Sequence, residues 1–193
     1  MSKKVLRGAI QKVATGPEFS KNISVEDSYN SMLSILDNDA DPVQAAIYLI
    51  AMRMKRETMD ENIGSLKALI DKSNIITADV DELLDIAEPY NGFLRNTPLS
   101  AFLPAVFASI GIPCITHGVK TVGPKFGLTT KRILETAGIN VEQNSQEASV
   151  SLENKDIGWA YLDQGEFCKP LYDLVDLRTR MVKRTILTTI EVL

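Results

Sequence analysis

The stretch that decides the fold runs over residues 117–130 and reads HGVKTVGPKFGLTT. It follows residues 112–116, whose apolar side chains predict a buried strand, and it leads into residues 129–137, which predict a helix ended by Gly138. A glycine-containing loop that joins a strand to a helix is typical of α/β domains. This part of the chain therefore predicts a parallel sheet covered by helices.

The segments on either side repeat this alternation. Residues 83–87 and 157–162 predict two further strands, and residues 97–110 and 146–154 predict helices. Ligands of such sheets lie beyond the carboxyl ends of the strands, so the loops over residues 88–96 and 117–128 form the expected binding region.

Residues 98–115 form the longest apolar stretch and are long enough to suggest a membrane span. Pro104, Gly111 and Pro113 interrupt the stretch, so a buried helix followed by a buried strand is the better interpretation. The basic N-terminus lacks the apolar region and the cleavage site of a secretory signal. We therefore expect a cytoplasmic protein that does not bind membranes.

Residues 3–75 predict helices throughout. The expected N-caps are Ser24, Asp41 and Thr58. Asp27 and Glu61 complete capping boxes with Ser24 and Thr58, and Pro42 occupies the first helical position after Asp41. Apolar residues follow the last two caps at helical spacing, namely Val43, Ala46, Ile47, Ile50 and Met54, then Met59, Ile63, Leu66 and Ile70. Each stripe is expected to be buried against another helix of a compact bundle.

The composition excludes several classes of protein. With 45% hydrophobic and 24% charged residues, the 193-residue chain is that of a globular protein. Its two cysteines, Cys114 and Cys168, form no disulfide framework and look inert, and one histidine leaves a zinc site without ligands.

The net charge is −4, but residues 89–134 contain no aspartate or glutamate. The basic residues there are Arg95, Lys120, Lys125, Lys131 and Arg132. We expect an anionic partner to bind to this stretch.

The loop over residues 117–130 has three features that phosphate binding needs. Gly118, Gly123 and Gly127 let backbone amides approach a ligand, two lysines supply charge, and Thr129 begins the next helix. The pattern matches neither the Walker loop nor the dinucleotide fingerprint, so an ordinary glycine-rich turn remains the alternative.

Three segments together resemble one known family. They are residues 42–58 (PVQAAIYLIAMRMKRET), residues 112–127 with the His-Gly pair, and residues 177–186 (LRTRMVKRTI). They resemble the anthranilate phosphoribosyltransferases and their nucleoside-phosphorylase relatives, in the same order along the chain.

The resemblance implies a helical dimerisation domain over residues 1–76 and an α/β domain over residues 77–193 that is incomplete at its C-terminus. It also implies that phosphoribosyl pyrophosphate (PRPP) and Mg²⁺ bind in a cleft and that an aromatic amine displaces pyrophosphate. The family's acidic Mg²⁺ ligands have no counterpart in this chain. No catalytic residue is assigned, and Arg178 matches the arginine on the acceptor side.

The sequence also departs from the family pattern. Residues 88–92, Glu-Pro-Tyr-Asn-Gly, replace a glycine-rich turn, and Ser100 alone remains of an Asn-x-Ser-Thr motif. Glu88 would repel pyrophosphate, and Pro89 lacks a backbone donor. We expect an altered PRPP site, for which the candidate phosphate-binding residues are Asn91, Gly92, Ser100, His117, Gly118, Lys120, Lys125 and Gly127.

A branch of the same fold with a Pro-Tyr-Asn-Gly turn provides the alternative function. Its members are homodimers that bind nucleic acid, so a module that binds single-stranded nucleic acid is the second hypothesis.

Residue type alone favours two structural roles, with His117 as a satisfied loop histidine and Tyr90 packed on its own domain. The apolar residues 184–193 suggest that the chain stops partway through a larger sheet. We therefore expect no PRPP turnover by this chain.

Overall fold

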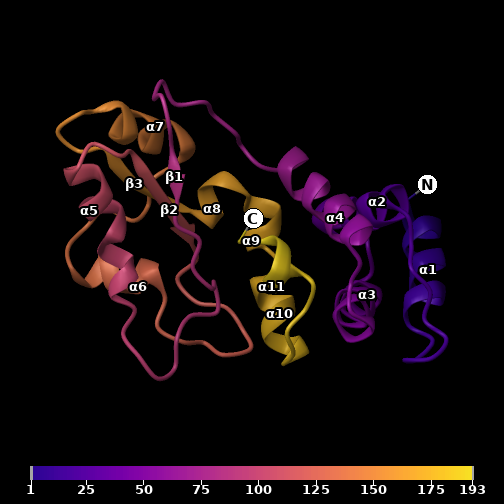
Figure 1. Cartoon of the computed structure of the whole chain (residues 1–193). Helices are drawn as coiled ribbons and strands as arrows, with labels where there is room; N and C mark the ends of the chain where they lie inside the picture. Colours follow the sequence, from indigo (N-terminus) through magenta and orange to yellow (C-terminus); the bar gives the residue numbers. More distant parts are fainter. Residues whose placement is uncertain (1, 193) are drawn as a thin grey trace. The chain divides into compact units, whose positions relative to one another are not determined.

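The structure is a computed structural model that describes residues 2–192. It has two compact units (Figure 1). The helical unit consists of the described residues of Met1–Ser73 and Asp173–Leu193, and the α/β unit of Asn74–Tyr172. The first division lies close to the expected boundary at residue 76. The C-terminal segment differs from expectation, because it belongs to the helical unit.

The helical unit contains six helices among the described residues. They are α1 (Ser2–Val13), α2 (Val25–Leu36), α3 (Pro42–Lys55), α4 (Met59–Asp71), α10 (Val175–Met181) and α11 (Leu187–Ile190). Ser24 accepts a hydrogen bond from Asp27 N, Asp41 accepts one from Val43 N, and Thr58 forms a reciprocal capping box with Glu61. The helix starts were therefore predictable from the sequence.

The expected apolar stripes of α3 and α4 are not the buried faces. Val43 and Met54 on α3 are 67% and 77% exposed, and Met59 on α4 is 73% exposed. The buried face of α4 is instead made of Gly64, Ser65, Ala68 and Leu69. A Cβ atom at Gly64 would lie 2.3 Å from the Val25 carbonyl oxygen, so small residues let α2 and α4 approach closely.

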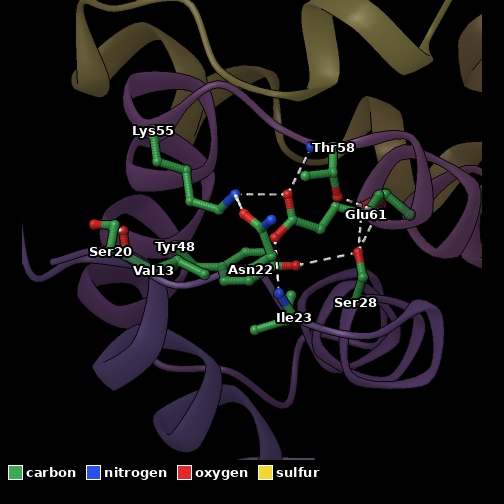
Figure 2. A network of polar contacts seen from close by, with 10 residues as sticks. Val13, Ser20, Asn22, Ile23, Ser28, Tyr48, Lys55, Thr58 and Glu61 are labelled. Atoms are coloured by element: carbon green, nitrogen blue, oxygen red, sulfur yellow. Dashed lines mark hydrogen bonds and ion pairs between the residues drawn. The ribbon is translucent and has the colours of Figure 1, made fainter. Parts of the chain in front are cut away.

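A buried polar network joins α2, α3 and α4 (Figure 2). The Glu61 carboxylate is fully buried and accepts hydrogen bonds from Lys55 Nζ at 2.8 Å, Thr58 N at 2.7 Å and Ile23 N at 2.9 Å. Ser28 donates to the Glu61 carbonyl oxygen at 2.7 Å. Burial also raises the pKa of the neighbouring Tyr48 to about 12. The network fixes the turn between α3 and α4.

The apolar C-terminal segment is helical within the described residues and contributes no strand to the three-stranded sheet. Ile186 and Leu187 are fully buried, Ile190 is 1% exposed, and the Ile186 amide donates to the Leu49 carbonyl oxygen on α3. Residues at positions i and i+4 lie on one face of a helix, so this apolar segment buries its side chains as α11 within the helical unit.

The α/β unit contains a three-stranded parallel sheet, as expected, in the order β1-β2-β3. The strands are β1 (Leu84–Asp85), β2 (Cys114–Gly118) and β3 (Trp159–Asp163). The helices are η1 (Leu99–Phe102), α5 (Leu103–Ser109), α6 (Thr130–Thr136), α7 (Ser145–Glu153), α8 (Gln164–Phe167) and α9 (Lys169–Tyr172).

The single helix expected over residues 97–110 is divided. Its first turn is the 3₁₀ helix η1, and α5 begins at Leu103 with Pro104 in its first turn. Proline has no backbone N–H to continue a helix from the preceding turn, which accounts for the division. No helix within residues 2–192 has the length and apolar character needed to span a bilayer.

The two faces of the sheet carry separate cores. On one face, Tyr161 packs with Ala101, Leu134 and Val141, and Trp159 packs against this cluster. On the other face, Ala160 packs with Ala148 and Leu152 of α7. Both faces are covered, so the loops at the strand ends are the places where a ligand can approach the sheet.

Candidate functional site

The two loops expected to bind a ligand meet beyond the carboxyl ends of β1 and β2. The Gly127 amide donates to the Asn91 carbonyl oxygen at 2.9 Å, and Phe93 pairs with Leu128 through two backbone hydrogen bonds of 2.9 Å. The structure therefore joins Asn91 and Gly92 to Gly127, although they lie far apart in the sequence.

Gly92 and Gly127 pack directly on each other. Gly92 has a φ of +71°, and a Cβ atom on it would lie 2.6 Å from the Gly127 carbonyl carbon. A Cβ atom on Gly127 would lie 2.6 Å from Phe93 N. Both glycines are required by this close backbone approach.

Replacing Gly92 with alanine should separate the two loops, because the new methyl group meets backbone atoms and the positive φ is unfavourable for alanine. We expect a loss of about 1–3 kcal/mol in the free energy of unfolding of the α/β unit. Urea denaturation measures this loss. Gly138→Ala is the matched control, because Gly138 has a φ of +79° but open space around it. An equal loss in both variants would show that backbone strain alone, and not the close approach, makes Gly92 necessary.

His117 is the penultimate residue of β2, and protein groups lie at both of its ring nitrogens. The Tyr90 hydroxyl contacts Nδ1, and Asp85 Oδ2 lies 3.3 Å from Nε2. The Phe167 ring lies edge-on at a centroid distance of 5.9 Å. Tyr90 is 2% exposed and so packs on its own unit. This arrangement holds the imidazole firmly and leaves it poorly placed to act as a base on a ligand.

Lys120 and Lys125 belong to the loop that follows β2. Lys120 is exposed and forms an ion pair of 2.9 Å with Glu135 of α6, whose side chain is 44% exposed. Such exposed pairs contribute at most about 1 kcal/mol, so an anionic ligand can compete with Glu135. Lys125 is half-buried between Pro124 and Phe126. The loop thus presents Lys125 and, once its exposed pair with Glu135 is broken, Lys120 to a ligand.

The other candidates occupy different parts of the α/β unit. Ser100 lies in η1 and is half-buried. Gly118 ends β2, and a Cβ atom on it would lie 3.2 Å from the Tyr161 hydroxyl oxygen. Within residues 2–192, that hydroxyl and Asn91 Oδ1 are buried without a hydrogen-bond partner. These two atoms are polar groups near the strand ends that a bound ligand or water would satisfy.

Lys131, one of the basic residues of the acid-free stretch, is paired with carboxylates from outside that stretch. It is 5% exposed and forms ion pairs with Asp163 at 2.8 Å and Glu142 at 2.9 Å. Burial lowers the pKa of Lys131, but the hydrogen bonds and charges of the two carboxylates outweigh burial and raise it. The acid-free stretch is therefore less positive than its composition indicates. The one signal for this pairing in the sequence was Asp163, a carboxylate at the end of a buried strand.

Arg178 belongs to the helical unit and forms a buried pair with Glu191. Both side chains are 2% exposed, and the guanidinium forms two hydrogen bonds to the carboxylate, of 2.5 and 2.8 Å. Burial of this pair, more than the loss of donors, keeps an acceptor carboxylate away from Arg178.

Among the described residues, metal-binding and thiol groups contribute little to the candidate site. Residues 2–192 contain no cluster of three or more His, Cys, Asp or Glu side chains that could hold a metal ion. These side chains therefore do not fit a Mg²⁺ ion bound by protein ligands alone. Burial and the Asp85 charge raise the pKa of the Cys114 thiol to about 11, so it is inert at neutral pH, as expected.

Comparisons with known proteins find similarity to glycosyl transferases and to anthranilate phosphoribosyltransferases. Residues 7–73 match the family model described as "Glycosyl transferase family, helical bundle domain". The anthranilate phosphoribosyltransferase of Methanothermobacter thermautotrophicus is 27% identical over 167 residues, which are 86% of this chain and 45% of the relative. The corresponding protein of Caldivirga maquilingensis is 26% identical and covers 94% of this chain and 51% of its own length.

Solved structures show the same fold. Anthranilate phosphoribosyltransferase from Thermus thermophilus matches with a TM-score of 0.77 at 20% identity, over 96% of this chain and 53% of that one. The enzyme from Saccharomyces cerevisiae, in complex with PRPP and Mg, matches with a TM-score of 0.71 at 18% identity, over 97% of this chain and 54% of that one. This chain thus spans about half the length of the relatives it matches.

Proposed function

This chain belongs to the anthranilate phosphoribosyltransferase-like family of glycosyl transferases, and from that premise we propose that its α/β unit binds the pyrophosphate end of a phosphoribosyl donor. The observation that carries the proposal is the packing of the Tyr90–Gly92 turn on Gly127, within the loop that carries Lys120 and Lys125. A second observation supports it, since Asn91 Oδ1 lies beside this contact as a buried polar atom that a ligand could satisfy.

The chemistry we propose for the whole protein is phosphoribosyl transfer from PRPP to an aromatic amine. The amine nitrogen bonds to the anomeric carbon of ribose while the bond from that carbon to pyrophosphate breaks, and the nitrogen releases one proton to solvent. Lys120 and Lys125 would neutralise the charge that develops on the leaving pyrophosphate, and the loop contacts would position it. No step is assigned to a metal ion held by these residues.

We also propose that the donor site is altered relative to those of its relatives. Glu88 places a carboxylate at the turn, and Pro89 removes a backbone donor. PRPP should therefore bind less tightly to this turn than to the glycine-rich turn of the family. Turnover by the 193-residue chain is therefore not expected.

The test is a calorimetric titration of the full chain with PRPP plus Mg²⁺ and, separately, with a single-stranded oligonucleotide. The proposal expects PRPP to bind and pyrophosphate to compete with it. The alternative, a nucleic-acid-binding module, expects the oligonucleotide to bind with an affinity that falls steeply as salt is raised. Lys120 and Lys131 are paired with carboxylates and the net charge is −4, which favours the small ligand.

We propose that the helical unit forms a homodimer. The exposed face of α3 lines a groove of about 670 Å³, together with residues of α1 and α10; Val43, Ile47, Met54 and Leu177 are among its apolar residues. A second copy of the chain would cover these side chains, and pairing is a common way for a thin helical core to gain burial.

Ile47→Glu should convert the dimer to a monomer, because a carboxylate would be buried at the centre of the α3 face. Sedimentation equilibrium at tens of micromolar protein measures the mass. Ile110→Glu is the control, since Ile110 is also exposed but lies in the α/β unit. A wild-type chain that sediments as a monomer would contradict the dimer.

A further inference from the structure

Tyr90, His117 and Asp85 form a continuous chain of polar contacts at the ends of β1 and β2. The chain runs from a phenol that is 2% exposed to a carboxylate whose side chain is 48% exposed. The imidazole lies between them, with a side-chain exposure of 13%, and Phe167 packs edge-on against the ring. All four residues belong to the α/β unit.

The neighbours of His117 determine which nitrogen carries the proton when the ring is neutral. The ionised Asp85 carboxylate is only an acceptor, so Nε2 must hold the hydrogen that faces it. Nδ1 is then left as an acceptor, and the Tyr90 hydroxyl donates to it. In this state, His117 connects Tyr90 to Asp85 and has no nitrogen left to bind a ligand directly.

The position of Tyr90 bears directly on the candidate binding loop. Tyr90 precedes Asn91, whose carbonyl oxygen accepts the Gly127 amide at 2.9 Å. Gly92 then packs on Gly127 with no room for a side chain. A shift of the Tyr90 ring would therefore be passed through two backbone contacts to the segment that carries Lys125.

We propose that Tyr90, His117 and Asp85 act as a latch that holds the Tyr90–Gly92 turn against Gly127 and so positions the lysine loop for a phosphate-bearing ligand. The identity of that ligand rests on the proposed function, whereas the closure of the turn does not. In this proposal the three side chains are positioning residues, and the loop makes the contacts to the ligand.

The first test is amide hydrogen exchange in the full chain. Tyr90→Phe removes only the hydroxyl group and should accelerate exchange of the Gly127 amide about three- to tenfold, which corresponds to the loss of one hydrogen bond. Tyr172→Phe is the matched control, because Tyr172 is 41% exposed and lies in the same unit. Exchange at Gly127 that is the same in Tyr90→Phe and wild type would overturn the latch.

The second test uses the fact that His117 is the single histidine of the chain. Nitrogen-15 spectra of the imidazole therefore report on this site alone. The latch expects the neutral ring to carry its proton on Nε2 in the wild type, and this preference should weaken in Asp85→Ala. A neutral wild-type ring protonated on Nδ1 would overturn the proposal.

The third test measures the affinity for inorganic pyrophosphate. Tyr90→Phe should bind several-fold more weakly than wild type, and His117→Asn, whose side-chain oxygen can accept from Tyr90, should bind more tightly than His117→Ala. If wild type binds pyrophosphate and Tyr90→Phe binds equally well, the positioning role is overturned while the proposed function stands. If wild type binds neither pyrophosphate nor PRPP, the proposed function fails, and the exchange and imidazole results decide whether the latch holds the turn.

Discussion

Replacing Glu61 with alanine should reduce the free energy of unfolding of the helical unit by about 3–5 kcal/mol, because it leaves the Lys55 ammonium buried without its counter-charge. The Lys55 and Glu61 side chains, whose ion pair is drawn in Figure 2, are 5% and 0% exposed, so bulk water does not reach the ammonium. The substitution also removes the acceptor for Ile23 N and Thr58 N. Urea denaturation followed by circular dichroism measures the loss.

Two further variants separate the causes of this loss. Glu61→Gln keeps an acceptor oxygen in place but removes the charge, so its effect should be smaller than that of alanine. Glu18→Ala removes an exposed carboxylate from a loop and should change stability by less than about 0.5 kcal/mol. A Glu61→Ala variant as stable as Glu18→Ala would contradict the role given to the network.

Replacing Glu191 with alanine should cost about 3–5 kcal/mol of unfolding free energy, because the Arg178 guanidinium would stay buried with both of its hydrogen bonds to the carboxylate lost. The comparison variant is Asp176→Ala. Asp176 pairs with Arg180 at 3.0 Å on the surface of the same helix, where the side chains are 80% and 61% exposed. That exposed pair should contribute at most about 1 kcal/mol. Thermal unfolding of both variants measures the difference, and equal losses would contradict a structural role for Glu191.

This pair also bears on the acceptor site that the family resemblance assigns to Arg178. The guanidinium has N–H groups left beyond the two that bond Glu191, but its side chain is only 2% exposed, so burial limits access of a second carboxylate. If Arg178 does bind an acceptor in the whole protein, the packing that buries the Arg178–Glu191 pair must open first.

Local sequence signals predicted the starts of three helices and the parallel character of the sheet. The caps at Ser24, Asp41 and Thr58 are side-chain to backbone hydrogen bonds within three residues, so the information they need is local. The alternation of strands and helices after residue 80 likewise indicated the parallel sheet, since a parallel pair requires a crossover connection.

The buried faces of α3 and α4 were not predictable in the same way. The apolar stripe on α3 suggested a core-facing side, but the bundle buries Ala45, Tyr48, Leu49 and Met52. The close contact of α2 with α4 depends on Gly64 and on serines that satisfy one another, which no apolar periodicity reveals. A face that is apolar yet exposed within one chain has the character of an interface.

The candidate site was predictable as a set of loops but not as a set of contacts. The glycines and lysines of residues 117–128 indicated an anion-binding loop. The pairing of Gly92 with Gly127, the contact of Tyr90 with His117 and the burial of Lys131 join residues distant in the sequence, so they follow only from the folded structure.

The most direct test of the central claim is calorimetric titration of pyrophosphate into wild type, Lys125→Glu and Lys155→Glu. Both variants change the net charge equally, but Lys155 is exposed at the amino end of β3, away from the candidate loops. Binding at the loop predicts that Lys125→Glu weakens pyrophosphate by about 1–3 kcal/mol while Lys155→Glu binds like wild type. Equal affinities in all three proteins would contradict the claim that this loop holds the phosphate-bearing ligand.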